Sequence, residues 1–556
     1  MEHEKPFFKT EDFWAMAIGG FLLLVGLGIY FSILPTDTKE RIGRLETDLK
    51  NDASKPFKTV AWHEANTGLE KLKLSSEPFG KFLKKLTGKP NSWTTNPVEA
   101  FFKPATKSDL STDAEAVNNA LRLALEAESA AVMARYADET LNRQAETAIN
   151  QWQEALKKFE KKNDKLKPGN FSFPHLIGLF MFLALLFGIG ANVQGTPFPN
   201  FAKGFTIVFS LSLVSLFLAG QKDLHDLGIE YAVWAIVLGM LISNTIGTPK
   251  WVSGALTTEF YIKTGLVLMG AEVLFNKILA IGLPGMFVAW VVTPIVLVST
   301  FWFGQNVLKI ASKSLNITIS ADMSVCGVSA AVATAAASKA TREELTVAIG
   351  MSMVFTAIMM IVMPLFIKFI GMPEVLGGAW IGGTVDSSGA VVAAGAALGD
   401  KAMYVAATIK MIQNVLIGFV AFGVAIYFAS KVEKNAGAPV IGIGEIWKRF
   451  PKFILGFIGA SLLFSAIYTL LGDHMAYTVL EEGVLGGFTK NLRTWFFCLA
   501  FASIGLSTNF KELRHHFTGG KPLLLYVCGQ ALNLVLTLAM AYLMFYLIFP
   551  EITKNI

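Results

Sequence analysis

The chain has 556 residues, of which 53% are hydrophobic and only 16% charged, and its mean hydropathy is +0.50. Soluble domains carry about a quarter charged residues, so this composition excludes an ordinary soluble globule and predicts an integral membrane protein. The formal net charge of +6 is small for this length and spread over many short loops, which argues against nucleic acid as a partner.

Residues 1–34 are expected to form an N-terminal transmembrane anchor. An apolar run of 22 residues extends from Phe13 to Leu34 and is long enough to cross a bilayer. Pro35 follows this run, and the small-residue pattern of a cleavage site is missing. These features favour an uncleaved span over a signal peptide.

Residues 35–172 differ from the rest of the chain in charge. They hold 43 of the Asp, Glu, Lys and Arg residues, about 31% of the segment, whereas the other 418 residues hold 47, about 11%. We therefore expect a soluble insertion. Because Gly and Pro are absent between Ala105 and Lys167 and apolar residues recur at helical spacing, it should be largely helical. It could be a helical hairpin packed on itself or a coiled coil with another subunit or partner, and we expect the membrane bundle to fold without it.

Residues 173–556 are expected to form a core of about twelve membrane segments. Apolar runs long enough to span a bilayer occur near 174–193, 203–220, 227–247, 255–275, 279–308, 315–338, 343–371, 376–398, 402–430, 452–471, 488–508 and 521–549. The fold class predicted is thus an all-α, polytopic membrane bundle. Its orientation stays open: the basic loops at 431–452 and 511–521 suggest one side, while counting thirteen spans places the Lys-rich 157–167 segment on the other.

Two of these runs, 315–338 and 376–398, are rich in Ala, Gly and Ser and carry polar residues at mid-membrane. Placing Gly327 over Gly389 aligns their polar clusters, which indicates an internal repeat of the kind found in secondary transporters. A helix that breaks in the membrane and starts again directs backbone donors and a positive dipole end into the protein. The pattern predicts an anion site at the two breaks, although close helix packing alone also favours small residues.

Polar residues near the breaks complete the predicted site. Lys410 shares a helical face with Gln413 and Asn414 at i+3 and i+4 and could bind an oxyanion. Asp322 and Asp386 are candidates to carry a coupling proton or sodium ion, because a carboxylate inside the membrane is energetically unfavourable and usually has a functional role. The predicted substrate-binding residues are Ser324, Cys326, Gly327, Ser329, Thr384, Ser387, Ser388, Gly389, Lys410 and Asn414.

Other ionisable residues have simpler interpretations. Lys263 is expected to pair with Glu259 at i−4 near a membrane boundary, and Glu272 is expected at the interface. The three cysteines, Cys326, Cys498 and Cys528, lie in apolar stretches without a CxxC pattern, so neither a disulfide framework nor a metal site is predicted. No P-loop, nucleophile elbow or metal-ligand helix is recognisable. We expect neither an enzyme nor an ATP-driven pump, and no cofactor beyond the coupling ion.

A family resemblance appears at the broken segments. The sequence S-V-C-G at 324–327 running into A-V-A-T-A at 331–335, and the sequences G-G-T at 382–384 and V-V-A-A-G at 391–395, resemble motifs of the YeiH-type bacterial membrane proteins, a family named for sulfate export. Between the last two motifs that family has a His, an acidic residue and later a Gln, where this chain has Asp386, Ser387 and Ala390. The resemblance covers residues 173–549.

The resemblance implies an inverted-repeat fold with two broken, crossing helices, similar to sodium/proton antiporters and bile-acid symporters, in the bacterial inner membrane. It implies a secondary active transporter of a small anion such as sulfate, sulfite or a sulfonate. A membrane channel or sensor, with the insertion as a signalling or assembly module, is the alternative. A homo-oligomer, most simply a dimer, is expected if the insertion pairs with a second subunit.

Overall fold

The computed structural model describes residues 6–52, 54–103, 110–166, 168–169, 171, 173–226, 231–272, 275–428, 452–509 and 520–555. Most of the two basic loops that bear on orientation, 431–452 and 511–521, lies outside these residues. Among the described residues the regular structure is helical and no β-strand occurs. The predicted all-α, polytopic class is confirmed.

The helices before the core cover the anchor and the insertion. They are η1 (Phe7–Lys9), α1 (Glu11–Ser32), α2 (Thr38–Asp52), α3 (Val60–Glu70), η2 (Leu74–Ser76), α4 (Pro78–Leu86), η3 (Pro97–Ala100), α5 (Ser111–Met133) and α6 (Glu139–Leu166).

The helices of the core follow in two groups along the chain. The first group is α7 (Phe173–Val193), α8 (Phe198–Ala219), α9 (Lys222–Asp226), α10 (Tyr231–Thr245), η4 (Lys250–Ala255), α11 (Thr258–Glu272), α12 (Phe275–Trp290), α13 (Val292–Asn306), α14 (Lys313–Ser324), α15 (Val328–Ser338) and α16 (Arg342–Phe369). The second group is α17 (Glu374–Thr384), α18 (Ser388–Leu398), α19 (Asp400–Asn414), α20 (Leu416–Tyr427), α22 (Phe453–Leu471), α23 (Asp473–Ala476), η6 (Tyr477–Thr489), α24 (Lys490–Ser507), α26 (Lys521–Tyr542), η7 (Leu543–Ile548) and α27 (Pro550–Asn555).

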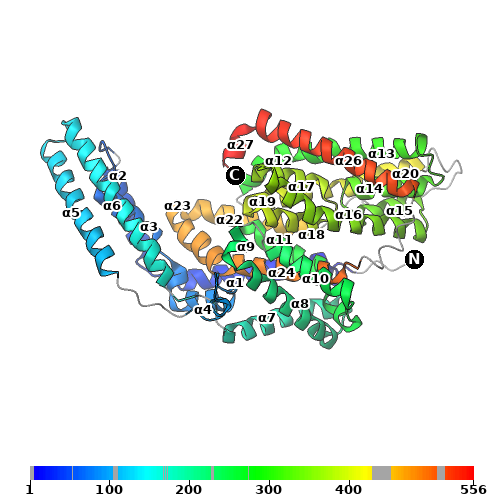
Figure 1. The fold of residues 1–556 in the computed structure, drawn as a ribbon, viewed down its shortest axis with the longest axis horizontal. Coiled ribbons are helices and arrows are strands. Elements are labelled where there is room, and N and C mark those ends of the chain that lie inside the picture. The colour runs from blue at the N-terminus through cyan, green and yellow to red at the C-terminus, as the bar shows by residue number, and fades with distance from the viewer. Residues whose placement is uncertain are drawn as a thin grey trace. The chain divides into compact units, whose positions relative to one another are not determined.

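Eight helices in the described part of the chain are long and apolar enough to cross a membrane, and the first is α1. Several predicted spans are instead pairs of shorter helices. The run 315–338 contains α14 and α15, and the run 376–398 contains α17 and α18 (Figure 1). The breaks predicted from small and polar residues are therefore present in both segments.

The chain divides into two compact units. Unit 1 comprises Met1–Leu22, Phe180–Leu463 and Leu492–Ile556, and unit 2 comprises Leu23–Leu179 and Phe464–Asn491. The boundaries fall inside α1, α7, α22 and α24. This division does not follow the boundaries expected from charge, because a segment from the second half of the chain, 464–491, joins unit 2.

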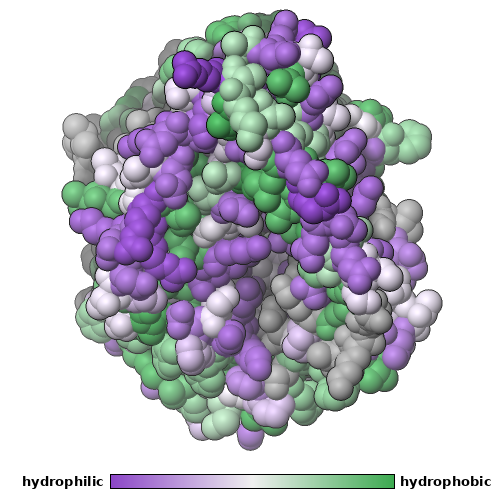
Figure 2. Space-filling view, turned by 90° about the vertical axis from the view of Figure 1, so that its left-hand side faces the viewer, coloured by the Kyte–Doolittle hydropathy of each residue, from purple (hydrophilic) through white to green (hydrophobic). Residues whose placement is uncertain are grey.

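Unit 2 contains a helical hairpin made by α5 and α6, which lie side by side (Figure 1). Ala124, Ala131, Ala145, Ile149 and Trp152 are buried in its core with Phe57 and Val60. The apolar stripe seen in the sequence therefore faces the interior of this unit. Figure 2 shows hydrophilic residues interspersed with hydrophobic ones on the face that it displays.

The segment 464–491 is tied to the insertion by hydrogen bonds within unit 2. The backbone N–H and hydroxyl of Ser75 donate to the two carboxylate oxygens of Glu482, at 3.2 and 2.7 Å. Asn491 donates to the hydroxyl of Thr87 at 3.4 Å. These contacts link residues more than 400 positions apart. Deleting the insertion would remove the hydrogen-bond partners of Glu482 and Asn491, which the expectation of an independently folding bundle does not take into account.

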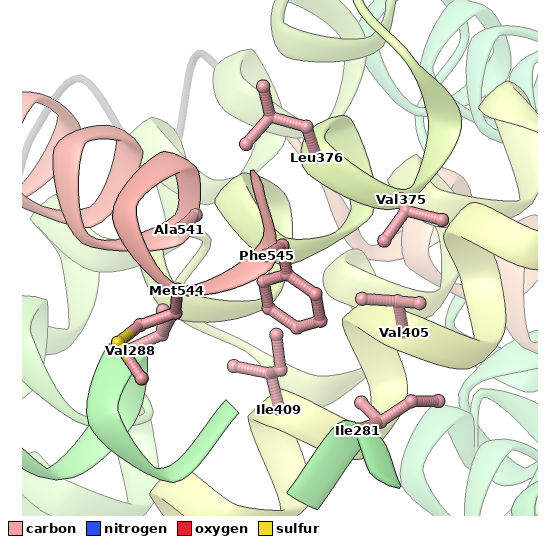
Figure 3. Packing of buried hydrophobic residues seen from close by; sticks show 10 residues of the cluster. Ile281, Val288, Val375, Leu376, Val405, Ile409, Ala541, Met544 and Phe545 are labelled. Carbon is pink, nitrogen blue, oxygen red and sulfur yellow. The ribbon is translucent and has the colours of Figure 1, made fainter. Parts of the chain in front are cut away.

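In unit 1, α17, α19, α26 and η7 share an apolar core with α12. Figure 3 shows the ring of Phe545 directed toward Ile409 and Met544 beside Val288, with Val375, Leu376, Val405, Ile281 and Ala541 in the same cluster. Lipid tails are as apolar as these side chains, so close van der Waals packing holds such helices together in a membrane. This core fixes α17 and α19, which carry residues of the candidate site.

Candidate transport site

The first broken helix changes direction at Gly327. α14 ends at Ser324 and α15 begins at Val328. Gly327 has φ +64 and ψ −129, in a region that favours glycine. A Cβ at this position would lie 3.0 Å from the hydroxyl oxygen of Ser352 and 3.4 Å from the Cβ of Asp386. Glycine is needed both for the conformation and for the close approach.

The second broken helix restarts at a capped end. α17 ends at Thr384, Val385 is extended, and α18 begins at Ser388. Ser387 is the N-cap, and its hydroxyl accepts a hydrogen bond of 3.2 Å from the backbone N–H of Ala390. Gly389 lies inside α18 and not at the break. The two breaks therefore correspond in type, while the aligned glycines occupy different positions in them.

Side chains of α19 cap the carbonyl ends of both broken helices. The Nζ of Lys410 donates to the carbonyl oxygen of Val325 at 2.6 Å and to Oε1 of Gln413 at 2.8 Å. The Nε2 of Gln413 donates to the carbonyl oxygens of Ser324 at 3.1 Å and Gly383 at 3.3 Å. A cation and an amide thus satisfy carbonyl groups that the helix breaks leave without intrahelical partners.

α26 adds two further caps. The Nε2 of Gln530 donates to the carbonyl oxygen of Thr384 at 3.0 Å, and the Nδ2 of Asn533 donates to that of Met323 at 3.4 Å. With α19, this helix provides donors for the C-terminal ends of α14 and α17. The N-terminal ends of α15 and α18 are consequently the ends left available to a ligand.

Two carboxylates are buried beside the breaks. Asp322 is fully buried and Asp386 is 1% exposed. The hydroxyl of Tyr526 donates to Oδ2 of Asp386, and the Tyr526 ring is stacked on Phe355 with centroids 4.6 Å apart. Asp322 interacts electrostatically with Asp386 and Lys410. This is a compact cluster of two acids, one cation and one phenol in the middle of unit 1.

A cavity of about 670 Å³ reaches the N-terminal ends of α15 and α18. This size is typical of small-molecule sites. Six of the predicted site residues line it: Cys326, Ser329, Ser387, Ser388, Gly389 and Asn414. Asn414 donates to the hydroxyl of Ser388 at 3.0 Å, and its buried Oδ1 has no hydrogen-bond partner within the described residues. One polar atom of this amide is thus left for a ligand.

The remaining predicted residues lie behind the cavity surface. Ser324 and Thr384 donate their hydroxyls to carbonyls of their own helices, those of Ser320 and Trp380, each at 2.7 Å. Gly327 and Lys410 belong to the break and its cap. Asp322 and Asp386 form the buried cluster, which the cavity approaches from one side through other residues.

Those other residues were not predicted from the sequence. Ser352 and Thr356, one turn apart on α16, line the cavity and interact with Asp386. Tyr526 and Gln530, one turn apart on α26, contact Asp386 and Thr384. Polar residues at i and i+4 in an otherwise apolar span are a detectable signal, because in a membrane they face protein in preference to lipid.

The expected partner of Lys263 is not its nearest one. Lys263 forms salt bridges with Asp12 at 2.9 Å and with Glu11 at 3.3 Å, while Glu259 interacts with it electrostatically without a salt bridge. Glu11, Asp12, Glu259 and Lys263 all line the cavity. The spacing of residues on one helix shows which side chains share a face. It does not show that α1, more than 200 residues away in the sequence, supplies the closer partners of Lys263.

Glu272 is buried inside the protein. Its side chain is 4% exposed and pairs with Arg493 at 2.9 Å. The hydroxyl of Tyr404 donates to the same carboxylate at 2.6 Å, and Asp400 lies 3.6 Å from the guanidinium. This buried network joins α11, α19 and α24 within unit 1.

Comparison with known proteins identifies the family. Residues 203–526, more than half of the chain, match the family model described as conserved hypothetical protein 698. A UPF0324 membrane protein of Nitratidesulfovibrio vulgaris is 50% identical over 557 residues, covering 98% of this chain and 96% of that protein. The chain belongs to the UPF0324 family of membrane proteins. It is thus an integral, multi-pass membrane protein.

Other members match over a smaller part of the chain. A UPF0324 membrane protein of Rhodopirellula baltica is 57% identical over 380 residues, 68% of this chain and 69% of that protein. The UPF0324 inner membrane protein YeiH of Escherichia coli is 28% identical over 61% of this chain and 95% of its own length. Nearly the whole of YeiH therefore corresponds to only part of this chain. No solved structure matches.

Proposed function

We propose that this UPF0324 protein is a secondary active transporter of a small anion such as sulfate, sulfite or a sulfonate, in the bacterial inner membrane. One observation carries the proposal: a cavity reaches the N-terminal ends of two broken helices, while donors from α19 and α26 cap the opposite carbonyl ends. Discontinuous helices that direct their N-termini at an anionic substrate are characteristic of secondary transporters.

The electrostatics at these ends suit an anion. Each helix N-terminus carries roughly half a positive charge, so the two ends together offer about one unit. Backbone N–H groups in the first turn have no acceptor within the helix, and those other than the N–H of Ala390, which Ser387 caps, can donate to an oxyanion. The hydroxyls of Ser329 and Ser388 line the same region and add donors that recognise oxygen without selecting among oxyanions.

We assign Lys410 a positioning role. The sequence favours it as a ligand of the anion, but its Nζ is bonded to the carbonyl of Val325 and to Gln413, and it does not line the cavity. By satisfying the end of α14 it holds the break at Gly327 open. The anion is then held by helix ends and hydroxyls, with Lys410 acting through the backbone that it supports.

Asp322 and Asp386 supply the coupling charge in this proposal. Two buried carboxylates next to an anion site repel the anion unless a cation or proton neutralises them. Anion binding and cation binding would then favour each other, which is the requirement for coupled transport. The alternative, a channel or sensor, needs no such linkage.

Counterflow in proteoliposomes tests the proposal. Vesicles loaded with unlabelled sulfate, sulfite, methanesulfonate or bicarbonate are diluted into a trace of the same labelled anion. A carrier accumulates the label transiently and saturably for at least one of these anions. Flux that is linear in the driving force and shows no counterflow would identify a channel and contradict the proposal.

A further inference from the structure

Three oxygens of the buried carboxylates make no hydrogen bond of normal geometry among the described residues, although the hydroxyl of Ser352 interacts with both side chains. These oxygens are Oδ1 and Oδ2 of Asp322 and Oδ1 of Asp386. Buried polar atoms in native proteins are almost always satisfied, so three adjacent exceptions indicate a missing partner. Both side chains are at least 99% buried, and bulk water therefore does not supply it.

The charge balance of the cluster indicates the charge of this partner. Among the described residues, Asp322 and Asp386 interact electrostatically with each other and with the single cation Lys410. Two carboxylates and one ammonium leave one unit of negative charge. The Nζ of Lys410 also donates to Val325 and Gln413. A single monovalent positive charge would balance the cluster.

The number of oxygens around the cluster favours a metal ion over a proton. A proton placed on Asp322 is covalently bound to one oxygen and donates to one other, so the third oxygen would depend on a hydrogen bond from the hydroxyl of Ser352 or Thr356. A hard cation prefers several oxygen ligands at once and can contact all three. The hydroxyl of Ser352 lies close to both carboxylates and that of Thr356 lies close to Asp386, which offers two more oxygens.

The cavity provides a route to this cluster. Ser352 and Thr356 line the cavity and also contact the carboxylates. Glu11, Asp12 and Glu259 line the cavity as well, against the single cation Lys263. Carboxylates in excess along a concave surface raise the local concentration of cations. The cavity thus carries acidic side chains and the hydroxyls of α16 on one continuous lining.

We propose that Asp322 and Asp386, with the hydroxyls of Ser352 and Thr356, bind one sodium ion. Divalent ions fit less well, because the cluster has only one unit of excess charge and two carboxylates. The site adjoins the helix ends assigned to the anion, and its role as the coupling site rests on the proposed function. Sodium binding itself does not depend on transport.

Thermal unfolding of the full chain in detergent tests sodium binding without any transported anion. Choline chloride is replaced by NaCl at constant ionic strength, with KCl as a parallel series. The melting temperature should rise saturably with sodium. Asp322→Asn and Asp386→Asn should each raise the half-saturating sodium concentration at least tenfold, whereas Asp223→Asn, an exposed carboxylate, should leave it unchanged.

Three results would overturn the sodium site. One is an equal response to choline, potassium and sodium; another is an unchanged sodium response in both Asn variants; the third is a response to pH alone, which would assign the cluster to a proton. If the Asn variants do not fold, Ser352→Ala and binding of radioactive sodium to the unmodified protein replace them. The expected stoichiometry is one ion per chain, and no saturable binding contradicts the site.

The outcome is separable from that of the proposed function. Saturable sodium binding without anion counterflow would leave the sodium site in place and remove the transporter. Saturable anion counterflow that is independent of sodium, in a protein that binds no sodium, would support the transporter and remove the sodium site.

Discussion

The side chain of Lys410 bonds to the carbonyl oxygen of Val325 at 2.6 Å, across 85 residues of sequence. This contact joins the C-terminal half of α19 to the end of α14, at the point where the chain leaves one half of a broken helix. A full positive charge meets the negative end of a helix dipole there. The relationship makes Lys410 part of the framework that presents the helix N-termini to the cavity.

Replacement of Lys410 should therefore destabilise the protein. Lys410→Met leaves the Val325 carbonyl and Oε1 of Gln413 buried without their charged donor, and loss of these bonds should cost about 3 kcal/mol. Thermal unfolding in detergent measures the loss. Lys401→Met, on the exposed side of the same helix, is the matched control. If Lys410→Met melts at the same temperature as the unmodified protein but is no longer stabilised by the anion, Lys410 is a ligand of the anion and not a positioning residue.

The Arg493 network should behave as a coupled unit. Arg493→Met leaves Glu272 as an unpaired buried carboxylate, which should cost about 3–5 kcal/mol. Adding Glu272→Gln should restore much of the stability, because Tyr404 can still donate to the neutral amide. Arg143→Met removes an exposed ion pair with Glu139 and should cost less than about 1 kcal/mol. Additive losses in the Arg493 double variant would refute the coupling.

Deletion of the insertion should expose its dependence on the C-terminal half. Removing residues 39–167 takes away the Ser75 donors of Glu482 and leaves a carboxylate with fewer hydrogen bonds, at a cost of about 1–3 kcal/mol. The truncated protein should melt at a lower temperature, and Glu482→Gln in that background should recover part of the loss. A truncated protein as stable as the full chain would show that these contacts contribute little.

Asp52 should make the start of unit 2 sensitive to acid. Burial by itself raises the pKa of this carboxyl, but hydrogen bonds from Lys55 and from the backbone and hydroxyl of Thr59 outweigh burial and hold the pKa below its usual value. A pKa depressed on folding stabilises the folded state above the unfolded pKa of about 3.9. That contribution is lost as pH falls through the folded pKa.

Hydrogen exchange of peptides from α2 and α3 checks this pH dependence. At pH 6, Asp52→Asn should exchange faster than the unmodified protein. Well below pH 4 the two should converge, since the native carboxyl is then protonated as well. Asp48→Asn, an exposed position on α2, is the control. A difference that persists unchanged in acid would show that Asp52 acts by its shape and not by its charge.

The helix breaks could be predicted from the sequence because local chemistry determines them. Gly327 and Ser387 are residues that a turn and an N-cap require, and the runs of small residues around them mark helices that face protein. The same local pattern placed Cys326 and Ser329 at the cavity. Periodicity thus located the elements and the approximate site.

Partners distant in sequence could not be predicted in this way. Helical periodicity shows that Lys410, Gln413 and Asn414 share a face. It does not show that the ammonium group of Lys410 donates to a carbonyl oxygen 85 residues earlier. Likewise Tyr526 reaches Asp386 from 140 residues away. Such pairs depend on how helices pack, and packing is decided by complementary side-chain shapes along whole helices. Spacing within one helix carries no information about them.

The most direct test of the anion site places a fixed negative charge where the anion is expected. Ser329 lies in the first turn of α15 and faces the cavity, so Ser329→Asp keeps a residue that favours a helix N-terminus while repelling an anion there. Ser329→Asn is the neutral control of the same shape. In counterflow measurements of the transported anion, the Asn variant should retain the activity of the unmodified protein and the Asp variant should lose it, with both proteins melting at or above the original temperature. Counterflow by the Asp variant equal to that of the Asn variant would contradict the account, because it would show that no anion binds at this helix end.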